Sequence, residues 1–213
     1  MTNQLNALLI LVLVINLFAL GTSRILALIR IVALQGALLG VLPLLVHLHV
    51  GWPAIVVTAV AIALKGIAIP AIMVRALRDA QIKREVEPLI GFLPSILLGA
   101  VATAFALLFS GRLPLIEQHA GSLLVPASIS TILTGFLLLT SRYKALTQVV
   151  GYLVLENGIF IFGMLLIEAM PFVVEVGVLL DLFVGIFVIC IITNHINAAF
   201  SSMDTRRLVT LKE

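Results

Sequence analysis

The sequence predicts an all-α polytopic membrane protein, a bundle of seven transmembrane helices that forms one integral membrane domain over residues 1–213. Three observations predict this fold. First, 62% of the 213 residues are hydrophobic, 11% are charged and the mean hydropathy is +1.26, which is more apolar surface than a soluble domain buries. Second, several apolar runs reach the ~20 residues that an α-helix needs to cross a hydrocarbon core. Third, basic residues gather in alternate connectors between these runs.

Apolar runs and their polar flanks set the limits of each helix. The first run lacks the positively charged region of a secretory signal, so we expect it to be retained as the first span. Polar connectors then separate the runs at 22–24, 75–88, 111–122 and 141–144, and a polar tail occupies 194–213. The predicted helices are 4–20, 25–47, 53–74, 88–110, 123–140, 145–167 and 171–193. Within them, Pro43, Pro94 and Pro126 are expected to mark kinks.

The positions of lysine and arginine support this helix count and predict the orientation. With seven spans, only Arg112 lies on one side of the membrane, and Lys65 lies inside a span. The other side holds Arg24, Arg30, Arg75, Arg78, Lys83, Arg84, Arg142, Lys144, Arg206, Arg207 and Lys212. Because cytoplasmic loops carry the excess of basic residues, we expect the tail in the cytoplasm and the N-terminus outside.

Several function classes are not expected for this chain. The pI near 9.4 does not indicate nucleic-acid binding, because the basic residues form no stripe on a soluble face. Cys190, the single cysteine, lies in an apolar run and provides neither a disulfide framework nor a cysteine metal site. His47 and His49 are two residues apart, a spacing that does not bring their side chains to one helix face, so we do not expect them to bind a metal ion. The sequence has no Walker loop, dinucleotide loop or nucleophile elbow, so we expect no catalytic site in the chain itself.

Three ionisable residues fall in the middle of predicted spans: Lys65, Glu156 and Asp181. A charge at that depth costs about 2.5–3.5 kcal/mol even on lenient insertion scales. Each group therefore needs a partner, a water molecule or a neutral protonation state. Such groups are suited to passing protons, and they are our candidate functional residues.

The residues around Asp181 favour a functional position. Gly177, Asp181 and Gly185 recur at a spacing of four, so they lie on one helix face, where glycines let a neighbouring backbone approach. Glu175 lies six residues earlier and could lead from Asp181 toward the outer surface; an interfacial position near lipid headgroups explains it equally well.

Glu156 and Lys65 also have suggestive neighbours. Tyr152 and Gly163 share a helix face with Glu156. Pro70 cannot donate a backbone hydrogen bond, which predicts an irregular helix beside Lys65. The alternative interpretation is a static one, in which a buried lysine and a buried carboxylate pin helices together.

Two uncharged polar residues, Asn16 and Gln35, also lie inside predicted spans. Amide side chains in membrane helices are more often partners in interhelical hydrogen bonds than transport ligands, and we expect that role here.

Four segments resemble the hydrogenase-4 component E family, a small multi-span subunit of group 4 membrane-bound [NiFe]-hydrogenases and formate hydrogenlyases. They are LKGIAIPAIM (64–73), QVVGYLVLENGIF (148–160), VVEVGVLLDLFV (173–184) and TRRLVTLKE (205–213), and the similarity extends over essentially the whole length. The last three helices also resemble the K subunit of respiratory complex I. In that subunit two helices each carry a buried glutamate; Glu156 matches the first, and Asp181 stands at the second.

The resemblance implies a non-catalytic subunit of an oxidoreductase complex in the prokaryotic cytoplasmic (inner) membrane. It implies no cofactor in this subunit, with the [NiFe] site and iron-sulfur clusters in a peripheral hydrogenase arm. Membrane partners would be antiporter-like subunits and a subunit like the H subunit of complex I. Glu156, Asp181, Lys65 and Glu175 would then line a proton or sodium path, and the alternative is a structural subunit that anchors the complex without conducting ions.

Overall fold

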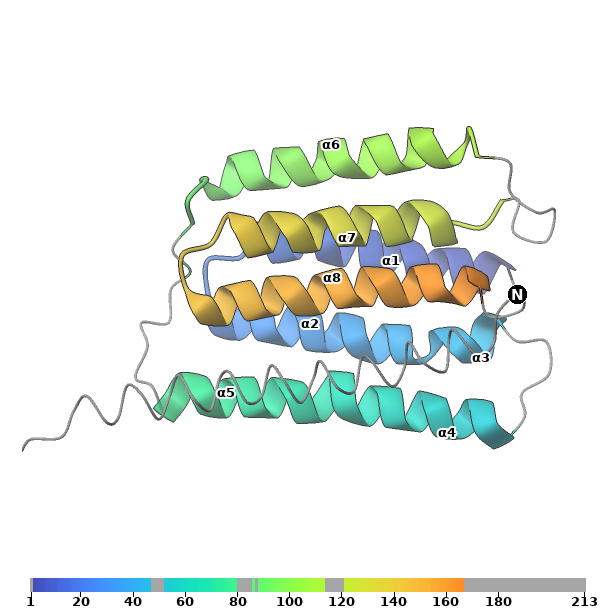
Figure 1. Ribbon diagram of the computed structural model, residues 1–213, viewed down its shortest axis with the longest axis horizontal. Helices are drawn as coiled ribbons and strands as arrows, with labels where there is room; N and C mark the ends of the chain where they lie inside the picture. Colours follow the sequence, from blue (N-terminus) through green and yellow to red (C-terminus); the bar gives the residue numbers. More distant parts are fainter. Residues whose placement is uncertain (1, 47–51, 80–85, 87, 114–120, 167–213) are drawn as a thin grey trace, which may run out of the picture.

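The structure, a computed structural model, describes residues 2–46, 52–79, 86, 88–113 and 121–166 (Figure 1). Within this described part the chain is helical and contains no strand, which confirms the prediction of an all-α fold. In chain order the elements are α1 (Thr2–Gly21), α2 (Ile25–Gly40), α3 (Leu42–Val46), α4 (Trp52–Ala61), the π-helical segment η1 (Ile62–Ala68), α5 (Ile69–Asp79), α6 (Phe92–Ser110), α7 (Leu124–Thr140) and α8 (Ala145–Leu166).

Helices of membrane-spanning length account for most of the described residues. Five are long and apolar enough to cross a membrane: Asn3–Gly21, Ile25–Leu45, Thr58–Arg78, Phe92–Ser110 and Leu146–Leu165. The helix Leu124–Thr140 is apolar but shorter, at 17 residues. The first six predicted helices therefore all have counterparts, and the seventh, 171–193, lies outside the described residues.

The predicted helix 25–47 is divided at Val41 into α2 and α3, and the limits of two further helices also differ from the predicted ones. The third helical run extends to Asp79, so Arg75 and Arg78 belong to α5 and not to a connector. The fourth helix begins at Phe92 and not at residue 88, because Gly91 takes the N-cap position. In both cases the end of the helix contains polar residues or glycine, so hydropathy alone did not locate it correctly.

Prolines in this chain mark helix starts where kinks were predicted. Pro43 is the second residue of α3, and Pro94 and Pro126 are each the third residue of their helices, α6 and α7. In the first turn a proline removes no intrahelical hydrogen bond, because that backbone N–H would have no partner within the helix. The prediction of kinks was wrong for Pro94 and Pro126. At Pro43 the apolar span Ile25–Leu45 is interrupted at Val41, between α2 and α3, as expected for a proline inside a span.

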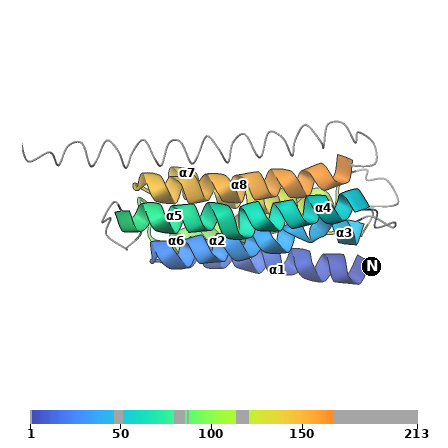
Figure 2. The same cartoon turned by 90° about the horizontal axis from the view of Figure 1, so that it is seen from below.

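The helices pack as two layers with one helix at each edge (Figures 1 and 2). One layer is the pair α1 and α2, and the other is the tightly packed pair α7 and α8. At one edge α6 packs against α1 and α7; at the other, the run from α4 through η1 to α5 packs against α2. Large side chains on α6 stay exposed, with Leu108 at 74%, as expected for a helix that faces lipid.

Basic connectors meet at one end of the bundle. The backbone N–H of Val86 donates to the carbonyl of Ser23 (2.7 Å), and that of Leu89 donates to the carbonyl of Ser141 (2.8 Å). At the other end the Asn6 side chain bonds the 121–123 segment. Among the described residues, the arginines in and beside these connectors therefore gather at one end, in agreement with the predicted asymmetry of charge.

Glycines bring α7 and α8 into close contact. A Cβ added at Gly151 would lie 2.6 Å from the backbone nitrogen of Leu139, and one at Gly158 would lie 2.6 Å from that of Ile132. At Gly135 an added Cβ would collide with the backbone of Leu155. Small residues of this kind allow membrane helices to pack backbone to backbone. This contact fixes the rotation of α8, and with it the direction in which Glu156 points.

Candidate functional site

Lys65 lies at the middle of the helical run Trp52–Asp79, inside the π-helical segment η1. In this segment the backbone N–H of Ile69 donates to the carbonyl of Leu64, five residues earlier. Pro70 follows directly and has no N–H to offer, so the regular α-helical pattern cannot continue through it. The irregular backbone predicted beside Lys65 is thus present, as π-helical turns.

Close packing against α2 sets the position of Lys65. A Cβ added at Gly36 would lie 2.9 Å from the Cβ of Lys65 and 3.2 Å from its carbonyl oxygen. One turn further along α2, a Cβ at Gly40 would lie 2.6 Å from the Ile62 side chain. Because α2 has no side chain at these two points, η1 approaches it closely and the lysine stem passes toward α8.

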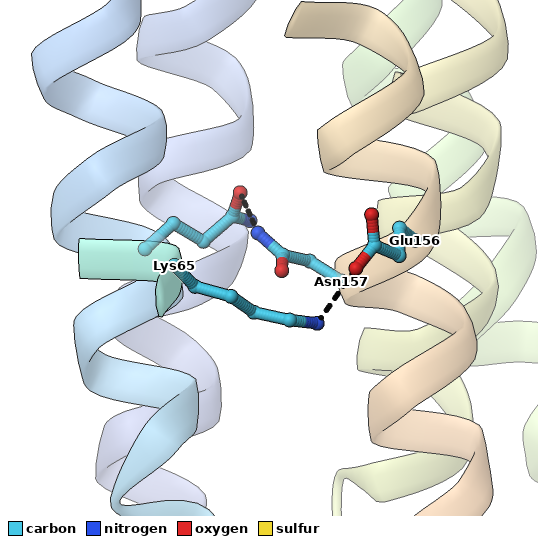
Figure 3. Close-up of polar contacts among 4 residues, drawn as sticks. Lys65, Glu156 and Asn157 are labelled. Carbon is cyan, nitrogen blue, oxygen red and sulfur yellow. Dashed lines mark hydrogen bonds and ion pairs between the residues drawn. The ribbon is translucent and has the colours of Figure 1, made fainter. Parts of the chain in front are cut away.

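Lys65 and Glu156 form an ion pair across the bundle. The distance between Lys65 Nζ and Glu156 Oε1 is 3.1 Å, and the two side chains are 13% and 6% exposed. Figure 3 shows Lys65 reaching from η1 to Glu156, which projects from the middle of α8 beside Asn157. A buried pair of this kind relieves each charge of much of its desolvation penalty. The sequence identified both residues and raised a lysine–carboxylate pair as one alternative; the structure shows that Glu156 is the partner of Lys65.

An aromatic ring completes the surroundings of the ammonium group. Lys65 Nζ lies 4.9 Å from the ring centroid of Phe160, one turn after Glu156 on α8. This distance is within the range of a cation–π interaction, whose worth rises to about 2 kcal/mol when the cation is desolvated. The lysine therefore retains a favourable site when the carboxylate beside it changes charge.

A chain of buried side-chain hydrogen bonds runs through the bundle and ends next to Glu156. Asn157 Nδ2 donates to Gln35 Oε1 (3.4 Å), Gln35 Nε2 donates to Asn16 Oδ1 (2.8 Å), and Asn16 Nδ2 donates to Thr131 Oγ1 (2.9 Å). All four residues are buried. The chain connects α8, α2, α1 and α7, which confirms the interhelical role predicted for Asn16 and Gln35. Asn157 and Thr131 were not predicted as members.

A small cavity adjoins the ion pair. Its volume is about 20 Å³, and its polar lining comes from Lys65, Glu156 and Asn157, while the remaining lining is chiefly apolar and includes Ile29, Pro70 and Met73. A cavity needs roughly 10–15 Å³ and two to four polar partners to hold a water molecule. This one therefore has the size and the polar groups for a single water in contact with the pair.

The other predicted site residues have different outcomes. Asp181 and Glu175 lie outside the described residues, so their predicted roles stay predictions. Gly163, predicted as a gap on the Glu156 face, has no atom of the described part within 4 Å of an added Cβ. Gly158 is instead the glycine of α8 that meets a neighbouring backbone near Glu156.

Arg142, which was expected only as a cation at the membrane surface, is 1% exposed. Its Nη2 donates to the carbonyl of Leu20 (2.8 Å) at the end of α1, and its guanidinium lies 5.3 Å from the ring centroid of Phe92 at the start of α6. Burial lowers the pKa of Arg142 from its ordinary value. Since an arginine stays protonated in proteins, this residue acts as a buried clamp at the end of a helix, where a cation is favourable.

The described residues contain no cluster of three or more histidine, cysteine, aspartate or glutamate side chains that could hold a metal ion. The chemistry that the site itself offers is proton exchange and charge pairing between a carboxylate and an ammonium group.

Comparison with known proteins finds one informative relative. The chain is 31% identical over 193 residues to the uncharacterized protein Rv0085 of Mycobacterium tuberculosis, and the match covers 88% of this chain and 86% of the relative. No family model and no solved structure matches the chain.

Proposed function

This chain belongs to the same protein family as Rv0085 of Mycobacterium tuberculosis, and we propose that it is an ion-translocating subunit of a larger membrane complex. The observation that carries the proposal is the Lys65–Glu156 pair, two titratable groups in contact at the middle of two apolar helices and beside a cavity of water size. Ionisable residues at such a depth are expensive, and they typically mark ion pathways or proton relays.

Charge pairing gives this site a simple working cycle. With Glu156 ionised, its carboxylate holds the Lys65 ammonium at 3.1 Å. A proton that reaches Glu156, through a water in the cavity, neutralises the carboxylate and removes most of that attraction. Lys65 then interacts more strongly with Phe160 and with any other anion nearby. Loss of the proton restores the pair, so the position of the lysine follows the charge of the glutamate.

The complex that we propose is a group 4 membrane-bound [NiFe]-hydrogenase of the hydrogenase-4 or formate hydrogenlyase type, as the resemblance of the sequence implies. Seven spans, a cytoplasmic tail and a location in the prokaryotic inner membrane belong to the same proposal. Partner subunits would carry the metal sites and supply the driving force by electron transfer. Asp181 and Glu175 would extend the path from Glu156, with a proton or a sodium ion as the transported species.

A structural subunit is the second candidate, and the hydrogen-bond chain favours it. The bonds from Asn157 through Gln35 and Asn16 to Thr131 join four helices and leave little freedom at this level. In that case Lys65 and Glu156 would be a further static link, and the chain would anchor or bridge larger subunits.

Substitution of Glu156 distinguishes the two candidates. Glu156→Gln keeps the size and most of the hydrogen bonding of the side chain but cannot titrate. We expect the complex with Glu156→Gln to retain hydrogenase activity with an artificial electron donor and to lose most of its ion-gradient formation in sealed vesicles. Glu156→Asp should retain part of the coupling, because a carboxyl group still titrates there. A fully coupled Glu156→Gln complex would contradict the proposal.

A further inference from the structure

A groove runs along the bundle between α2 on one side and η1 with α5 on the other. Its volume is about 660 Å³, within the range of small-molecule sites. Small and apolar residues line its inner part: Ile29, Ala33, Gly66, Pro70, Ala71 and Val74. Because three of these residues are glycine or alanine, the two helices leave a hollow between them.

Three arginines line the same groove at one end. Arg30 lies in the second turn of α2, and Arg75 and Arg78 lie in the last turns of α5; all three are exposed. None of the described residues that line the groove is acidic. This end of the bundle is the one at which the basic connectors meet, and a long arginine side chain at such a position has the length to place its charge among lipid headgroups. The groove is therefore cationic at the interface and apolar further in.

The length of the groove matches one leaflet of a bilayer. From Arg78 to Gly66 the helix advances by twelve residues, which at 1.5 Å per residue is roughly 18 Å. One leaflet contributes about 15 Å of the ~30 Å hydrocarbon core. An acyl chain whose headgroup sits at the arginines would thus end near the middle of the membrane.

We propose that this groove binds an anionic phospholipid. Its phosphate contacts Arg30, Arg75 and Arg78, and one acyl chain lies along the small residues toward Gly66. The groove shares Ile29, Ala33 and Pro70 with the cavity beside Lys65 and Glu156, so the end of the acyl chain closes that side of the cavity. This lipid site is inferred from the charge and the shape of the groove, and it does not rest on the proposed role in ion translocation.

Fluorescence quenching by brominated lipids tests the proposal on the full-length chain. The chain has a single tryptophan, so Trp52→Phe with Leu34→Trp places one fluorophore beside Ala33, at a position that is 54% exposed. The protein is reconstituted in phosphatidylcholine vesicles with small fractions of phosphatidylglycerol or phosphatidylcholine brominated in the acyl chain. We expect phosphatidylglycerol to quench at a severalfold lower mole fraction than phosphatidylcholine.

Arginine variants then assign the preference. Each cationic residue near a membrane surface contributes about fivefold in affinity for anionic lipid, so Arg30→Gln and Arg78→Gln together should abolish the preference. Arg112→Gln, which removes the same charge at the opposite end of the bundle, should leave it unchanged. Unchanged tryptophan emission in the absence of brominated lipid shows that the variants keep their fold.

Three results would overturn the proposal. Equal quenching by the two lipids would show that the arginines select no anionic headgroup. Loss of the preference in millimolar inorganic phosphate would show a site for a free anion instead. Protection of the tryptophan from both lipids would show that protein, a second copy or another subunit, covers the groove.

Discussion

The ion pair between Lys65 and Glu156 can be tested by removing the ammonium group of Lys65 while the Glu156 carboxylate remains. Lys65→Met keeps a long flexible stem that fills the same space between η1 and α8. At the observed 3.1 Å, and with an effective dielectric constant near 20, the pair attraction is about 5 kcal/mol. Measured costs of breaking a buried pair from one side are about 3–5 kcal/mol, because the other charge is left without compensation.

A second substitution, Glu156→Gln, should restore most of the stability that Lys65→Met removes. In Lys65→Met/Glu156→Gln no charge is left at this level, and replacing both members of a buried pair is often neutral or stabilising. We therefore expect Lys65→Met to lower the free energy of unfolding by about 3–5 kcal/mol and the double variant to recover most of that loss. Glu156→Gln alone should also be destabilising, because it leaves the lysine charged.

Reversible unfolding in mixed detergent micelles, followed by the fluorescence of the single tryptophan, measures these free energies. The double-mutant cycle yields the coupling energy between the two side chains. A coupling below about 0.5 kcal/mol, the limit of simple additivity, would refute the argument that this ion pair holds η1 to α8. A Lys65→Met variant no less stable than its parent would refute it as well.

Three further predictions concern the rest of the chain. In a Cys190→Ser background, a membrane-impermeant thiol reagent added outside should label a cysteine at Ser122 and not one at Ser202; the reverse pattern contradicts the topology. Gly158→Ala should cost about 1–3 kcal/mol of stability because its Cβ would meet α7, whereas Gly163→Ala, whose Cβ would meet no atom of the described residues, should cost less; equal effects would disprove the close packing. Arg142→Met should lose about 1.5–3 kcal/mol through its hydrogen bond to the end of α1, measured by the same unfolding assay, and an unchanged stability would exclude the clamp.

Candidate site residues could be found from the sequence where burial of a charge is costly by itself. Lys65 and Glu156 stood out because each interrupts an apolar run, and a charge there requires an explanation whatever the fold. Thr131 gave no such signal, since a threonine in a membrane helix often satisfies its hydroxyl with its own backbone. Arg142 was assigned to the surface, because the positive-inside rule gives the side of a cation and not its depth.

The sequence by itself determined the helical class and most of the spans, because a backbone in lipid must satisfy its own hydrogen bonds and an apolar run of sufficient length has little choice but a helix. It also determined which end of the bundle collects the arginines. Only the tertiary structure decided that Lys65 meets Glu156, and that Asn16, Gln35 and Asn157 form one chain. Those contacts depend on the rotation of each helix about its axis, which glycines such as Gly36 and Gly158 set through backbone contacts between segments distant in sequence.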